Sequence, residues 1–107
     1  MLLSLGVFQL AIARAAPAAA GTITQYAIPP YTSQPFGITL GPDGNLWFTE
    51  RYADQIGRIT ITGHVTEFPI PNETGAQLEP VYITRGPGSA LWFTELYAGM
   101  IGKITTK

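Results

Sequence analysis

A repeat with a period of 45 residues constrains the fold of this 107-residue chain more than any other feature. Residues 46–50, LWFTE, recur 45 residues later, and so do residues 56–60, IGRIT, in the form IGKIT. Residues 65–71, VTEFPIP, also match residues 23–29, ITQYAIP, at a spacing of 42. Self-similarity at a nearly fixed period means that one small structural unit is used more than once. We therefore expect an array of units that pack on one another.

Each unit divides into short extended runs separated by turn residues. In the first unit these runs are residues 36–40, 45–50, 56–61 and 64–70. The alternation of side chains within 56–61 is typical of strands, and the sequence GPDG at 41–44 supplies a tight turn. Four antiparallel strands in about 45 residues is the size of a propeller blade. The predicted fold class is all-β, built from β-propeller blade repeats whose Trp-Phe pairs pack one blade on the next.

The repeat also sets the predicted domain organisation. We assign residues 1–20 to a signal peptide and residues 21–107 to a partial β-propeller. A stray outer strand at 22–28 precedes a four-stranded first blade at 35–70, and a second blade at 80–107 lacks its fourth strand. Propellers typically hold four to eight blades. We therefore expect this chain to be an N-terminal fragment, with about five more blades downstream.

The signal-peptide prediction rests on an almost wholly apolar run that ends at Ala13 and is followed by AAPAAAG. Small residues at 18–20 suit cleavage before Gly21, and the apolar run is too short to span a bilayer. Arg14 follows the apolar run, whereas a signal peptide places its basic residues before it. The predicted location is secreted or periplasmic, with no membrane contact after cleavage. The alternative is an N-terminal tail on a cytoplasmic protein.

Charge and residue usage argue against several other functions. Six Lys and Arg residues against seven Asp and Glu residues give a net charge of −1, so no basic surface for nucleic acid is expected. The chain has no cysteine, which excludes disulfides and thiolate chemistry. The single histidine, His64, follows the turn at Thr62 and Gly63, and we interpret it as a surface residue. Asp43 is interpreted as a turn residue because the loop lacks the further carboxylates of a calcium site.

The units FGITLGPDGNLWFTE and VTEFPIP resemble the repeats of the streptogramin B lyases, also called virginiamycin B lyases. The resemblance covers residues 22–107 and implies a seven-bladed propeller. It also implies a carbon–oxygen lyase activity, in which a Mg²⁺-assisted elimination opens a cyclic depsipeptide antibiotic at its ester bond. The implied partner is therefore a small cyclic depsipeptide, and the implied cofactor is Mg²⁺.

The resemblance also implies site residues. Those lyases carry a Glu-Pro-His-Gly-Ile type sequence before strand one and a glutamate at the end of strand two. The histidine is the base, and the two glutamates hold the metal. In this chain Glu79 and Glu95 fill the metal positions, but Val81 stands where the base would be. We therefore assign no catalytic residue, and the sequence leaves open whether the protein is an enzyme. Phe36 resembles a family position that lines the substrate pocket.

Structural interpretations of the acidic residues compete with the metal assignment. A glutamate that ends strand two in both units, as Glu50 and Glu95 do, is expected to accept hydrogen bonds from turn amides. Glu79 has Gln34 as its counterpart, and its simpler interpretation is a solvated loop carboxylate.

Three functions remain in competition. The first is the N-terminal part of an exported lyase-like propeller that is inactive as this fragment. The second is a non-catalytic secreted propeller that binds a ligand or a protein across its rim, because a fold alone does not determine function. The third is a two-blade chain that assembles with copies of itself through its open strand edges.

Overall fold

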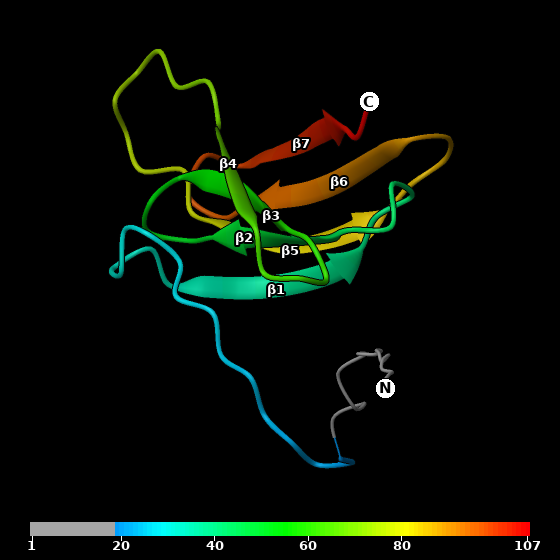
Figure 1. The fold of residues 1–107 in the computed structure, drawn as a ribbon. Helices are drawn as coiled ribbons and strands as arrows, with labels where there is room; N and C mark the ends of the chain where they lie inside the picture. The colour runs from blue at the N-terminus through cyan, green and yellow to red at the C-terminus, as the bar shows by residue number, and fades with distance from the viewer. Residues whose placement is uncertain (1–18) are drawn as a thin grey trace, which may run out of the picture.

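The computed structural model describes residues 19–107, which fold into two antiparallel sheets (Figure 1). The predicted signal peptide at 1–20 lies almost entirely outside the described residues. The four-stranded sheet contains β1 (Pro35–Leu40), β2 (Leu46–Glu50), β3 (Gln55–Ile59) and β4 (Val65–Pro69). The three-stranded sheet contains β5 (Pro80–Arg85), β6 (Ala90–Glu95) and β7 (Met100–Thr105). Within each sheet, every strand pairs with the next one along the chain, so the all-β prediction of one full blade and one three-stranded blade is confirmed.

The predicted stray strand at 22–28 is not a strand in the structure. An outer strand forms only beside a third strand that offers a free edge, and no strand of the described residues pairs with this segment. Instead, Tyr26 and Ile28 lie against blade one, where they line a cavity together with Ile38 and Phe48. The Tyr26 ring occupies the space that a side chain at Gly63 would fill. Within residues 19–107 no helix is long and apolar enough to cross a membrane.

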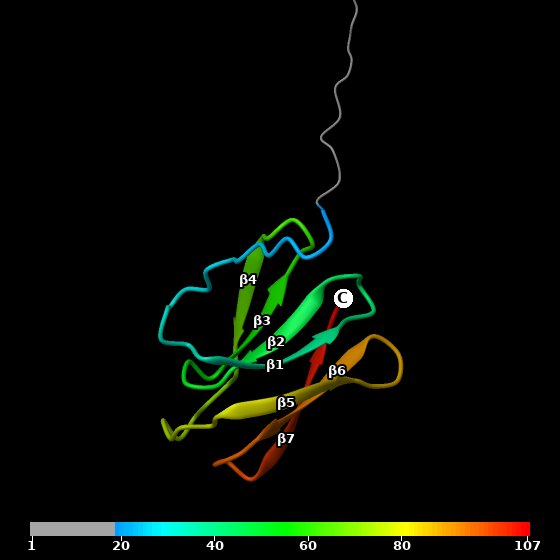
Figure 2. The same cartoon turned by 90° about the horizontal axis from the view of Figure 1, so that it is seen from below.

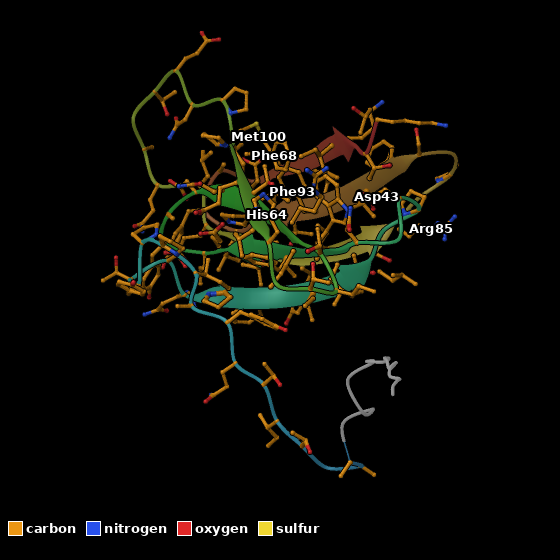
Figure 3. The ribbon with its side chains drawn as sticks, viewed as in Figure 1. Asp43, His64, Phe68, Arg85, Phe93 and Met100 are labelled. Carbon is orange, nitrogen blue, oxygen red and sulfur yellow. The ribbon has the colours of Figure 1, made fainter. Side chains whose placement is uncertain are left out.

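The two blades pack face to face (Figure 2). Their shared core is made by Trp47, Ile56, Leu91 and Phe93, with Phe68, Ile70, Ile83 and Ile104 packed around it. The Trp47 ring stacks on Phe68 with 5.4 Å between ring centroids. Figure 3 labels Phe68 and Phe93 where the sheets face each other. Buried aromatic and aliphatic area of this kind is the main term that holds a small all-β unit together.

Glycines in the repeated IG[RK]IT segment make room for the aromatic residue on the neighbouring strand. Phe48 pairs with Gly57 across β2 and β3, and Phe93 pairs with Gly102 across β6 and β7. In both blades the phenylalanine ring lies where a Cβ atom of the glycine would be. The two recurring motifs are therefore two halves of one packing contact, which explains why they repeat together.

The two copies of the repeat differ sharply in burial. Trp47 is 0% exposed but its counterpart Trp92 is 38% exposed, and Ile56 is 1% exposed whereas Ile101 is 66% exposed. Blade two covers the face of blade one that carries Trp47. No element of the described part of the chain covers the matching face of blade two. The same residues thus serve as core in one blade and as open surface in the other.

Candidate functional site

The candidate site lies at the end of the blades where the inner strands begin and the second strands finish. Pro35 pairs with Glu50 in blade one, and Pro80 pairs with Glu95 in blade two. The hairpin geometry therefore places the start of each inner strand beside the end of its partner, as the sequence predicts. The inner strands β1 and β5 lie next to each other (Figures 1 and 2). This end of the blades, called the rim below, therefore contains the positions that the family pattern assigns to the metal ligands, the base and the substrate pocket.

A β-bulge follows the first residue of the inner strand in both blades. It opens the strand pairing between Pro35 and Ile38, and the hydroxyl group of Thr49 fills the gap. Thr49 Oγ1 accepts from the N–H of Gly37 at 2.9 Å and donates to the carbonyl oxygen of Val81 at 2.8 Å. The hydroxyl therefore links the bulge of blade one to the inner strand of blade two. The recurrence of threonine in LWFTE is the sequence signal for this contact.

Glu79 is 3% exposed, so it is not a solvated loop carboxylate. Its Oε2 atom accepts a hydrogen bond from Nε of Arg51, 2.6 Å away, in an ion pair between the blades. Its backbone N–H donates to Oδ1 of Asp54 at 2.9 Å. Neither Arg51 nor Asp54 has a counterpart of its own kind in the second unit, where Leu96 and Gly99 stand. Repeat comparison therefore overlooks both partners.

Phe36 is 51% exposed and lies on the same rim. Its ring packs edge-on against Tyr82 with 5.6 Å between centroids. The guanidinium carbon of Arg51 lies 5.8 Å from the Phe36 centroid and 5.2 Å from the Tyr52 centroid. The structure thus gives Phe36 aromatic and cationic neighbours and leaves half of it open. The substrate contact assigned to Phe36 stays a prediction.

The two glutamates that end the second strands are both buried, which differs from the expected contact with turn amides. Both carboxylate oxygens of Glu50, and Oε2 of Glu95, are buried without a hydrogen-bond partner. Burial, together with the nearby Glu67 carboxylate, raises the pKa of Glu50 to about 8. Burial also raises the pKa of Glu95, and the negative charge of Asp54 adds to this shift. Desolvation favours the neutral form of a carboxyl group in both places.

These residues offer an unfavourable setting for the metal that the family pattern implies. Glu79 is already paired with a guanidinium, and burial raises the pKa of Glu95, which makes its ionised form less favourable. Mg²⁺ takes oxygen ligands from ionised carboxylates. Across residues 19–107 no three His, Cys, Asp or Glu side chains lie together as a metal site would require. The assignment of Glu79 and Glu95 as ligands remains a prediction.

The predicted absence of a base in this blade has a structural counterpart. Val81 is buried and its carbonyl accepts from Thr49, so this position serves the contact between blades. His64 is exposed beside the turn between β3 and β4, which agrees with its interpretation as a surface residue. Figure 3 shows His64 near that turn.

Comparison with known proteins places this architecture in a family. The sequence profile of the virginiamycin B lyase family matches residues 9–107. The virginiamycin B lyase of Bacillus licheniformis is 52% identical over 43 residues, which is 40% of this chain and 15% of that protein. The virginiamycin B lyase of Bordetella pertussis is 42% identical over 40 residues, which is 37% of this chain and 13% of that protein.

Solved structures give the same relationship. A catalytically inactive variant of the virginiamycin B lyase from Staphylococcus aureus, crystallised with quinupristin, matches with a TM-score of 0.76 and 46% identity. The match covers 82% of this chain and 29% of that chain. The selenomethionine form of the same enzyme gives a TM-score of 0.75 and 47% identity. The two blades therefore correspond to part of a propeller, and the chain described above belongs to the virginiamycin B lyase family.

Proposed function

We propose that this chain is the N-terminal part of an exported virginiamycin B lyase-like propeller that opens the ester bond of cyclic depsipeptide streptogramins. The family match over residues 9–107 carries the proposal. The Staphylococcus aureus relative, crystallised with quinupristin, supports a depsipeptide as the ligand. The chain spans less than a third of that relative, so activity belongs to a longer protein. The apolar start of the sequence supports export.

The two blades carry no histidine at the position where the family pattern places its base. An elimination needs a base within hydrogen-bond reach of the proton it abstracts. Valine at position 81 has no proton-accepting atom, and the single histidine is exposed beside an outer turn. We therefore expect this chain to be inactive alone and to contribute part of the rim, including Phe36, to the complete site. Mg²⁺, when bound elsewhere in the complete protein, would polarise the ester carbonyl.

Quinupristin offers a direct test of the proposal. The chain, a longer protein that contains it, and the Staphylococcus aureus enzyme as positive control are each incubated with the antibiotic. Tandem mass spectrometry then separates the ring-opened product from the intact ring, because elimination leaves the mass unchanged. We expect EDTA-sensitive ring opening by the longer protein and by the control, and none by the two-blade chain. Intact quinupristin after long incubation with the longer protein would refute the lyase proposal.

The second candidate is a non-catalytic propeller that binds a ligand or a protein at the same rim. It is favoured by Val81 at the base position and by the Arg51–Glu79 ion pair at a metal position. Calorimetry with quinupristin distinguishes the two candidates. Binding by the longer protein without ring opening supports the non-catalytic function, whereas ring opening excludes it.

A further inference from the structure

We propose that Arg51 is the permanent counter-ion of Glu79 and locks blade one to blade two, so that Glu79 and Glu95 do not bind Mg²⁺. The lock would take the place of a metal site in this blade. The inference concerns contacts within this chain, and it holds whether or not a longer protein is a lyase.

The ion pair has the geometry of a strong interaction. The distance of 2.6 Å joins Nε of Arg51 to Oε2 of Glu79, and their side chains are 26% and 4% exposed. Charge-assisted hydrogen bonds at such distances are stronger than neutral ones. The guanidinium also lies over the rings of Phe36 and Tyr52, an arrangement that attracts a cation. Arg51 is therefore held at Glu79 from more than one side.

The backbone of Glu79 is fixed by blade one as well. The Asp54 carboxylate accepts from the N–H of Glu79 at 2.9 Å and from the N–H of Leu78 at 3.2 Å. Glu79 has a φ of 52°, a left-handed conformation that side chains other than glycine rarely adopt. Such a conformation persists only where surrounding contacts enforce it. Both the side chain and the backbone of Glu79 thus belong to the junction between the blades.

The second carboxylate of the pattern cannot easily complete a metal site. Glu95 pairs with Pro80 across β5 and β6, and Pro80 directly follows Glu79 in the sequence. A cation that bridged both carboxylates would need Glu79 to leave Arg51 and would have to reach Glu95, which is only 6% exposed. Oε2 of Glu95 is buried without a hydrogen-bond partner, so Mg²⁺, which gives up its bound water reluctantly, would have to lose water to reach it. Breaking the Arg51 pair would also leave a buried charge unpaired.

A double-mutant cycle tests the lock. The melting temperature is measured for the chain, for Arg51→Gln, for Glu79→Gln and for the double variant, with Arg85→Gln as control. Arg85 is exposed at the end of β5, so its replacement should change the melting temperature by no more than about 3 °C. Arg51→Gln should lower it by at least about 10 °C, because it leaves the buried Glu79 carboxylate alone. Glu79→Gln should lower it by less, because the remaining Arg51 guanidinium is partly exposed to water. The double variant should be more stable than the sum of the two losses predicts.

The double variant keeps the test decisive even where a single variant fails to fold, since it contains neither charge. Magnesium is tested by comparing MgCl₂ with KCl at equal ionic strength. We expect no magnesium-specific change in the melting temperature of the unmodified chain. The lock is overturned by additive losses in the cycle. It is equally overturned by a magnesium-specific rise in melting temperature that Glu79→Gln removes.

Discussion

Replacing Glu50 by glutamine should remove much of the pH dependence of stability in this chain. Glu50 is fully buried at the end of β2, and neither of its carboxylate oxygens has a hydrogen-bond partner. Glu67 on β4 also has a buried, unpartnered Oε2. Burial raises the pKa of Glu50 to about 8, and Glu67 adds to the shift because it can accept a hydrogen bond from the protonated Glu50 carboxyl group and because of its negative charge. Glycine at position 57, between the two strands, leaves room for the Glu50 carboxyl group, because a Cβ there would lie 2.9 Å from Oε2.

The sign and size of the effect follow from that shift. In the folded chain Glu50 keeps its proton up to about pH 8, but in the unfolded chain it ionises near the ordinary glutamate pKa of 4.5. Rising pH between these values therefore favours the unfolded chain. Stability should be greatest below about pH 4.5, fall as the pH rises, and level off above about pH 8. At about 1.4 kcal/mol per pKa unit, the total loss is at most about 5 kcal/mol.

Urea unfolding followed by tryptophan fluorescence measures this loss at a series of pH values from 5 to about 9. Glutamine at position 50 cannot ionise and can still donate a hydrogen bond to Glu67, so Glu50→Gln should be more stable than the unmodified chain at alkaline pH. A weaker slope should remain in the variant because Glu95 also has a raised pKa. Glu73→Gln, in the exposed loop after β4, is the matched control. Parallel pH profiles for the unmodified chain and Glu50→Gln would refute the reasoning.

Three further substitutions test the packing of the blades, each by chemical denaturation. Trp47→Ala should cost about 3–5 kcal/mol and Trp92→Ala clearly less, because only Trp47 is fully buried; equal losses would contradict the assignment of the covered face. Thr49→Val should cost about 1–3 kcal/mol, since it leaves the Val81 carbonyl and the Gly37 amide without their shared hydroxyl, and a neutral result would show that water replaces it. Gly57→Ala should cost about 1–3 kcal/mol through a clash with the Phe48 ring, and an unchanged unfolding midpoint would show that the ring moves aside.

The fold was largely predictable because the repeat supplied the comparison that a single sequence normally lacks. The strands of blade one begin and end within two residues of the predicted positions, since turn residues and alternation both mark the boundaries. Residues 22–28 form no strand here although they match a fourth strand, because no strand of the described residues pairs with them; their predicted place in another blade stays a prediction. Strand formation depends on a partner, and a local pattern cannot supply one.

The site was less predictable, because its contacts join residues that differ between the two units. The pattern correctly placed Glu79 directly before the start of β5 and Glu95 at the end of β6, where the two strands pair. It missed Arg51, the partner of Glu79 across the blade junction. It also expected turn amides around Glu50, which instead lies buried near Glu67. Burial of a carboxyl group depends on what packs over it, and that is a property of the assembled blades.

Divergence between the two units makes the charged contact specific to one junction. Gln34 and Glu79 occupy equivalent positions with φ values of 53° and 52°, so the backbone geometry is shared and only the charge is new. Blade one presents a guanidinium and a carboxylate to Glu79, through Arg51 and Asp54. The equivalent positions of blade two carry Leu96 and a glycine, which can form neither an ion pair nor a side-chain cap. The Trp-Phe motif recurs in both units, whereas the ion pair is formed by residues that do not recur. We therefore expect the ion pair, rather than the apolar contact, to make the pairing of these two blades specific.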